Sequence, residues 1–149
     1  MPVPLASLIS EAVASARVLP GDHPLTWPED VSGQVLADPE RIGQVLRNVL
    51  SNAAKYSAPG TPIEIRVTRA GTTVRIEVID QGFGIHPDDL VRVFEKFGRG
   101  RDTAGRRIPG VGLGLYLSRQ IILAHGGTLT VTSTPGEGSV FGFTLEAAR

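Results

Sequence analysis

Three polar side chains recur at helical spacing within a stretch of mostly apolar residues. Asn48 and Asn52 lie four residues apart and Lys55 follows three residues later, so the three share one face of a helix. Asn costs roughly 0.5 kcal/mol relative to Ala inside a helix, so two of them in one helix suggest a use for carboxamide oxygens beside a cation. A solvated helix face is the alternative interpretation.

Two glycine-containing segments could also bind a ligand. Residues 80–84, Asp-Gln-Gly-Phe-Gly, follow an apolar strand, and they combine a carboxylate with glycines that permit close backbone approach. An ordinary turn favours the same residue types. Residues 110–115, Gly-Val-Gly-Leu-Gly-Leu, open a predicted helix, whose N-terminal N–H groups could bind an anion. This second segment is not a Rossmann fingerprint, because an Arg-rich loop precedes it, and no Gly-Lys-Ser/Thr follows as in a P-loop.

The hydrophobic pattern predicts the elements that would position these residues. Helical spacing predicts helices over about 5–16, from a cap at Asp38 to a stop at 58–60, over 87–94 and over 112–125. Alternation predicts strands around 63–67, 74–78, 129–131 and 141–145. This order predicts an α+β fold in which helices cover one face of a mainly antiparallel sheet.

Composition excludes several classes of protein. A chain of 149 residues with 41% hydrophobic and 20% charged residues is expected to form one globular domain. Because Lys+Arg and Asp+Glu balance at 15 each, bulk charge favours neither nucleic acid nor an anionic membrane as partner. No apolar run reaches the roughly 18 residues of a spanning helix. The absence of cysteine excludes disulfides and thiolate sites, and favours the cytoplasm.

The order and spacing of these segments resemble the ATP-binding catalytic domain of sensor histidine kinases. That family belongs to the GHKL superfamily, together with gyrase B, the Hsp90 chaperones and MutL. The resemblance covers residues 1–149 and implies a two-layer α/β sandwich of the Bergerat type. The segments similar to the family's N box, first glycine box, F box, second glycine box and last hairpin are 41–57, 80–84, 94–97, 110–115 and 134–141.

The resemblance implies roles for individual residues. Asn52 would ligate Mg²⁺, Asn48 and Lys55 would face the phosphates, Tyr56 would pack beside the adenine, and Asp80 would accept its exocyclic amine. The remaining nucleotide contacts implied by the two glycine boxes are Gly82, Gly84, Ile85, Gly110, Gly112, Leu113, Gly114 and Leu115.

The loop over 96–111 would be the ATP lid, and its Arg99 or Arg101 could reach the γ-phosphate. Hydrolysing members of the superfamily carry Glu at the position that matches Asn48. An Asn carboxamide cannot act as the general base for an attacking water. The resemblance therefore implies phosphotransfer to an acceptor on another domain rather than ATP hydrolysis.

Full sensor kinases carry an acceptor His beside an acid in a helix, and none of His23, His86 and His125 has that context. We therefore expect a catalytic domain of a larger kinase, cytoplasmic even if its parent is membrane-anchored, and monomeric alone. Its expected partners are a dimerisation domain that bears the acceptor histidine and a downstream response regulator. The alternatives are a regulatory nucleotide-binding module without turnover and an anti-sigma-type Ser/Thr kinase of the same superfamily.

Overall fold

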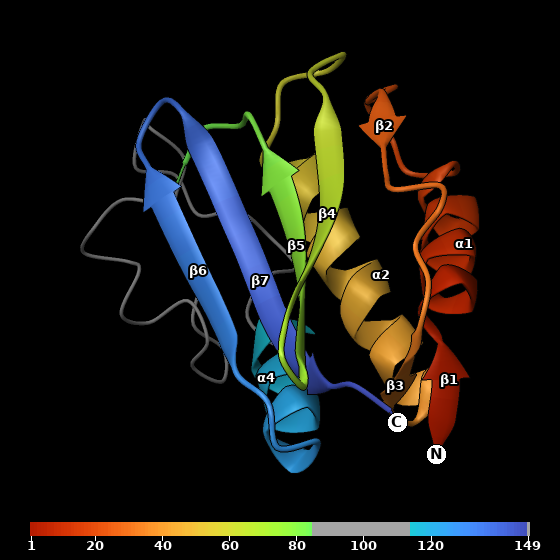
Figure 1. The fold of residues 1–149 in the computed structure, drawn as a ribbon. Helices are drawn as coiled ribbons and strands as arrows, with labels where there is room; N and C mark the ends of the chain where they lie inside the picture. Colours follow the sequence, from red (N-terminus) through yellow and green to blue (C-terminus); the bar gives the residue numbers. More distant parts are fainter. Residues whose placement is uncertain (85–113, 149) are drawn as a thin grey trace.

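A five-stranded sheet forms one layer of the computed structural model, which describes residues 1–84 and 114–148 (Figure 1). Its strand order is β2-β4-β5-β7-β6, and every pair is antiparallel except β2 with β4. The sheet is therefore mainly antiparallel, as predicted. The strands are β2 (Leu25–Thr26), β4 (Ile63–Ala70), β5 (Thr73–Asp80), β6 (Leu129–Thr134) and β7 (Gly138–Glu146).

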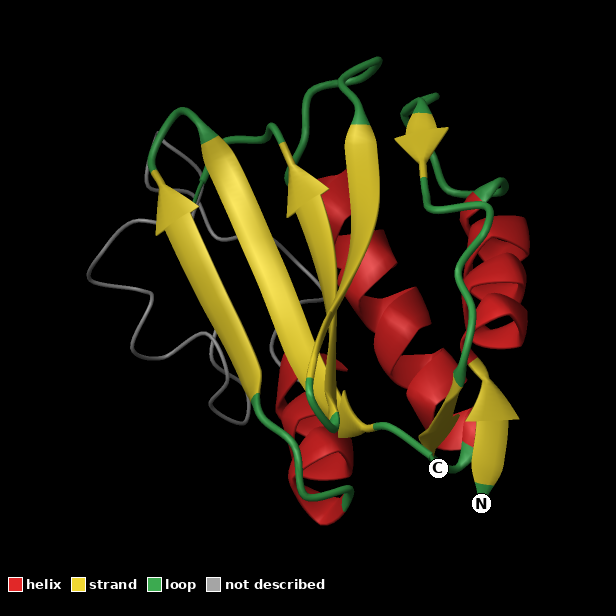
Figure 2. Ribbon diagram, viewed as in Figure 1, coloured by secondary structure: helices red, strands yellow, loops and turns green. Residues whose placement is uncertain are grey.

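Helices form the second layer, and all those described lie on the same face of the sheet (Figure 2). They are α1 (Leu5–Ala16), α2 (Pro39–Lys55) and α4 (Gly114–Ala124). The core lies between the layers, where inward-facing strand residues such as Ile76, Phe141 and Phe143 meet the apolar helix faces. The predicted two-layer α+β architecture is confirmed.

The helix α2 carries the polar face singled out above, and its start is well defined. Asp38 caps it, because its Oδ1 accepts hydrogen bonds from the backbone N–H groups of Glu40 (3.1 Å) and Arg41 (3.2 Å). Below the polar face runs a stripe of fully buried side chains, each worth about 1.5–3 kcal/mol when removed from water. The stripe consists of Ile42, Val45, Leu46 and Val49. This burial fixes the rotation of α2 about its axis, and so determines where the polar face of the helix points.

Three short strands were not predicted from the sequence. β1 (Pro2–Pro4) pairs with β3 (Gln34–Leu36) in a separate antiparallel sheet, and β2 adds only two residues to the main sheet. Runs of two or three residues are too short for alternation to show, and they form because tertiary contacts supply their partners. The predicted helix over 87–94 and the lid over 96–111 lie outside the described residues. Within the described part of the chain, no helix is long and apolar enough to cross a membrane.

Candidate functional site

Asp80 is the last residue of β5, and its carboxylate is buried, with 3% of the residue exposed. Its Oδ1 accepts hydrogen bonds from the backbone N–H groups of Gly82 (3.0 Å) and Ser139 (3.1 Å). Its Oδ2 is also buried, yet it has no hydrogen-bond partner among the described residues. Burial raises the pKa of the Asp80 carboxyl, and the two backbone hydrogen bonds and the nearby His23 offset this only partly.

The two oxygens of Asp80 therefore have different roles. The bond from the Gly82 N–H to Oδ1 is the side-chain turn that Asp commonly forms, so the ordinary-turn interpretation accounts for that oxygen. Nothing in the described structure accounts for Oδ2. A buried acceptor without a donor is costly, and a ligand N–H group that donated to Oδ2 would remove this cost.

The turn after Asp80 is pressed against the C-terminal end of α2. The N–H of Phe83 donates to the carbonyl oxygen of Tyr56 at 2.9 Å. A Cβ on Gly82 would lie 2.8 Å from the Tyr56 carbonyl carbon and 3.0 Å from the Ser57 Oγ, so only glycine fits there. Gly82 is thus required by packing within the protein, and its predicted closeness to a bound base stays a prediction.

Gly84 is restricted in a similar way, by the tip of the β6–β7 hairpin. Its φ of +73° lies in the left-handed region, and an added Cβ would lie 2.8 Å from Pro135 Cα. The hairpin turn over 135–137 is also bonded to this segment, because the N–H of Gly136 donates to the Phe83 carbonyl at 2.7 Å. The first glycine box is therefore held between α2 and this hairpin.

Two further buried hydroxyls lie where α2 ends. Tyr56 and Ser57 are 4% and 5% exposed, and neither hydroxyl has a hydrogen-bond partner among the described residues. Burial raises the pKa of the Tyr56 phenol well above its usual range. The Ser57 Oγ lies beside Gly82, the same residue whose backbone N–H donates to the Asp80 carboxylate. The sequence analysis gave Ser57 no binding role, because a Ser after a helix is usually only a turn residue.

The polar face of α2 is mostly not a solvated face. Asn52 is 4% exposed and Asn48 is half-buried, whereas Lys55 is exposed. The Asn48 Nδ2 donates to the Gly114 carbonyl (3.4 Å) and to Ser118 Oγ (3.2 Å), which ties α2 to the first turn of α4. The side-chain nitrogen of Asn48 is engaged by α4, and its Oδ1 accepts no hydrogen bond from the part of the chain that the structure describes, so this oxygen can act as an acceptor.

The second glycine box enters the described structure only at its end. Gly114 is the first residue of α4, next to Asn48, and a Cβ there would make only an ordinary contact at 3.7 Å. Leu115 is fully buried in the core. The remaining predicted site residues lie outside the described residues, so their predicted roles stay predictions; they are Ile85, Arg99, Arg101, Gly110, Gly112 and Leu113.

Residues 37–149 match the family described as histidine kinase-, DNA gyrase B-, and HSP90-like ATPase. The chain is 36% identical over 147 residues to the sensor-like histidine kinase SenX3 of Mycobacterium tuberculosis. The aligned segment covers 97% of this chain and 36% of that protein. It is 38% identical over 138 residues to the histidine-protein kinase/phosphatase MprB of Mycolicibacterium smegmatis, covering 91% of this chain and 27% of that protein. The chain thus spans about a third of the length of these relatives.

Solved structures agree with this assignment. The mycobacterial sensor histidine kinase MprB superposes with a TM-score of 0.84 at 31% identity, covering 99% of this chain and 98% of that chain. Full-length ShkA in complex with AMPPNP gives a TM-score of 0.81 at 27% identity, covering 99% of this chain and 31% of that one. The chain therefore belongs to the histidine kinase-, DNA gyrase B- and HSP90-like ATPase family, as an ATP-binding domain of the sensor histidine kinase type.

Proposed function

We propose that this domain binds ATP with Mg²⁺ and donates the γ-phosphoryl group to a histidine on a separate dimerisation domain. The observation that carries the proposal is the buried Oδ2 of Asp80, which has no donor among the described residues. The adenine exocyclic amine is an N–H donor that fits this acceptor. Guanine presents a carbonyl oxygen at the same place, so two acceptors would face each other.

The surroundings of Asp80 support adenine recognition. The Oδ1 atom is held by two backbone N–H groups, so the carboxylate cannot rotate to meet a different base without losing them. The buried Ser57 hydroxyl beside Gly82 can donate or accept, which suits the mixed edge of a purine. A polar edge fixed in this way selects among bases by their hydrogen-bond pattern rather than by their size.

The phosphates would lie further back along α2. Between Tyr56 and Asn48 the helix spans about 12 Å at 1.5 Å per residue, a distance that an extended nucleoside triphosphate covers. Asn48 contacts the first turn of α4, so the start of that helix borders the same end of the site. Backbone N–H groups at a helix start and the exposed ammonium of Lys55 both favour phosphate oxygens.

Asn52 would hold the metal through its side-chain oxygen. No group of three or more His, Asp or Glu side chains in residues 1–84 and 114–148 could hold a metal ion alone. Most oxygen ligands would then come from the nucleotide phosphates and water, which is how Mg²⁺ is commonly bound beside triphosphates. When bound, Mg²⁺ neutralises charge on the phosphates.

Phosphotransfer rather than hydrolysis follows from the side chain at position 48. The Asn48 carboxamide has no basic lone pair, and its nitrogen is engaged by α4, so it cannot deprotonate a water. What this domain supplies is positioning and charge stabilisation for an incoming imidazole nitrogen.

The test is transfer in trans. The chain is mixed with radiolabelled ATP, Mg²⁺ and a dimeric helical domain that bears the acceptor histidine of a similar sensor kinase. We expect acid-labile phosphate on the acceptor, at a rate limited by the weak encounter between unlinked domains. Arg99→Ala and Arg101→Ala are expected to lower the transfer rate more than the affinity for ATP, if either arginine stabilises the transition state.

Two outcomes would contradict this proposal. Acid-labile phosphate on His23, His86 or His125 of the isolated chain would show that it needs no separate acceptor. Tight MgATP binding without transfer to any acceptor domain would favour a regulatory nucleotide-binding module. An acceptor domain with its histidine replaced by Gln is the matched control.

A further inference from the structure

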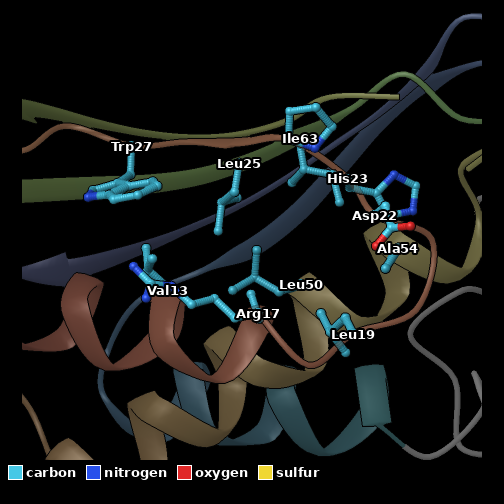
Figure 3. A pocket seen from close by; sticks show the side chains of 12 residues that line it. Val13, Arg17, Leu19, Asp22, His23, Leu25, Trp27, Leu50, Ala54 and Ile63 are labelled. Carbon is cyan, nitrogen blue, oxygen red and sulfur yellow. The ribbon is translucent and has the colours of Figure 1, made fainter. Parts of the chain in front are cut away.

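A cavity lies between α1, α2 and the edge of the sheet, next to Ile63, the residue of β4 that pairs with Asp80 (Figure 3). Its volume is about 430 Å³, within the roughly 300–1,000 Å³ of pockets that take small organic molecules. Neither Asp80 nor the polar face of α2 lines it. The cavity therefore borders the Asp80 site without sharing its predicted nucleotide-binding residues, and none of the roles inferred from the kinase resemblance uses its lining.

Most of the residues that line this cavity are apolar, and they come from several elements. α1 contributes Val13, α2 contributes Leu50, and the sheet side contributes Leu25, Trp27 and Ile63. Trp27 is only partly buried, so its indole ring offers a flat apolar surface to the cavity. Aromatic and aliphatic walls of this kind gain free energy by covering an apolar body, at roughly 25 cal/mol per Å².

Charged side chains stand at opposite ends of the mouth. The exposed Arg17 side chain extends toward the Trp27 end, and it has no ion pair with any described residue (Figure 3). Asp22 and His23 lie at the other end. His23 is held in place, because its Nδ1 donates to the Thr61 carbonyl at 2.7 Å. The Trp27 end of the cavity is thus apolar with an unpaired cation, whereas the carboxylate is remote from it.

We propose that this cavity binds a small aromatic anion, with its rings against Trp27 and its carboxylate or sulfonate on Arg17. The apolar walls match the ring system, and the unpaired guanidinium matches the anionic group. Such a ligand would contact α2 through Leu50 and Ala54, on the side of the helix away from Asn48 and Asn52.

A matched pair of dyes tests the proposal without nucleotide. Anilinonaphthalene sulfonate carries the anion, and N-phenyl-1-naphthylamine has the same ring system without it. Trp27 is the only tryptophan of the chain, so dye emission sensitised by tryptophan excitation reports a dye beside Trp27. We expect sensitised emission from both dyes, with tighter binding of the sulfonate. Trp27→Phe should abolish the sensitised signal, and directly excited dye emission then measures how far the smaller ring weakens binding of both dyes.

Two substitutions locate the dye. Ala16 lines the cavity, so Ala16→Phe should fill it and weaken both dyes at least tenfold, whereas Ala14→Phe on the exposed side of α1 should not. Arg17→Gln should weaken the sulfonate about two- to fivefold, the range for an exposed ion pair, and leave the neutral dye unchanged. Circular dichroism checks that each variant is folded, and if Ala16→Phe is not, the Arg17→Gln comparison decides.

Three results would overturn the proposal. These are an Ala16→Phe variant that is folded and binds both dyes as before, an equal response of both dyes to Arg17→Gln, and displacement of the dyes by excess ATP. The last result would place the dyes in the nucleotide site. Because the dye experiments need no nucleotide, failure of the proposed kinase function would leave their outcome readable.

Discussion

Replacing Asp80 by Asn changes the acceptor proposed for adenine and little else. The backbone N–H groups of Gly82 and Ser139 both donate to Oδ1, so the Asn carboxamide must keep its oxygen there. Its NH₂ group then occupies the place of Oδ2 and meets the adenine amine donor to donor. A hydrogen bond to a charged group contributes about 1.5–3 kcal/mol, so Asp80→Asn should weaken ATP binding about 10- to 100-fold.

The same substitution should change the choice of base. The new NH₂ group can donate to the guanine carbonyl, so the preference for ATP over GTP should disappear or reverse. Titration calorimetry with ATP and GTP measures both affinities, and Glu137→Gln on the exposed hairpin turn serves as a charge-matched control. Asp80→Ala is a poorer test, because it leaves two buried N–H groups unpaired and lowers stability as well. Equal binding of ATP and GTP by the unaltered chain would refute the assignment.

The pH dependence of stability gives an independent check on Asp80. Its folded-state pKa is raised, chiefly by burial, so the native state binds this proton more tightly than the unfolded chain. The resulting stabilisation is present at pH values below the unfolded pKa and is lost as the pH rises through the raised folded pKa. In urea titrations, the stability of Asp80→Asn relative to the unaltered chain should therefore decrease as the pH is lowered, because only the unaltered chain gains this stabilisation. A difference that does not change with pH would mean that Asp80 is not buried as described.

Three further substitutions test the proposed metal ligand, a contact at the start of α2 and the packing of Gly82. Asn52→Ala should weaken ATP binding in the presence of Mg²⁺ by calorimetry, and leave metal-free binding nearly unchanged; equal losses would remove Asn52 as the metal ligand. His125→Ala removes a 3.1 Å hydrogen bond to a backbone N–H at the start of α2, and should cost about 1 kcal/mol in urea unfolding, whereas exposed Gln120→Ala should not. Gly82→Ala should cost about 1–3 kcal/mol, because its methyl group would meet a backbone carbonyl, while Gly114→Ala, with only a 3.7 Å contact, should be tolerated; equal effects would contradict the packing described.

Long periodic elements could be predicted from the sequence because their pattern is local. The cap at Asp38, the apolar stripe of α2 and the alternation in β4 and β5 each follow from side-chain spacing, and the structure contains all of them. The strands β1, β2 and β3 could not be predicted, because two or three residues carry no period. The parallel pairing of β2 with β4 depends on residues Leu25 and Ile63, which are far apart in the chain.

The candidate site shows the same division. Asp80 followed by two glycines predicted a ligand segment, with an ordinary turn as the alternative, and the spacing of Asn48 and Asn52 placed both on one helix face. Only the tertiary structure decided that Ser139, 59 residues away, engages one Asp80 oxygen and that the other oxygen has no partner in residues 1–84 and 114–148.

Sequence by itself determined which residues are candidates for binding a ligand, because residue type and local spacing set the available donors, acceptors and helix faces; that the ligand is a nucleotide was implied by the resemblance to the kinase family. Tertiary structure alone decided how each is used. Packing of α2 against α4 engages the Asn48 nitrogen, and packing of the 80–84 turn against Tyr56 makes Gly82 obligatory for reasons internal to the protein. Burial and the pairing of a polar atom depend on neighbours brought together from distant parts of the chain, and no local pattern encodes those neighbours.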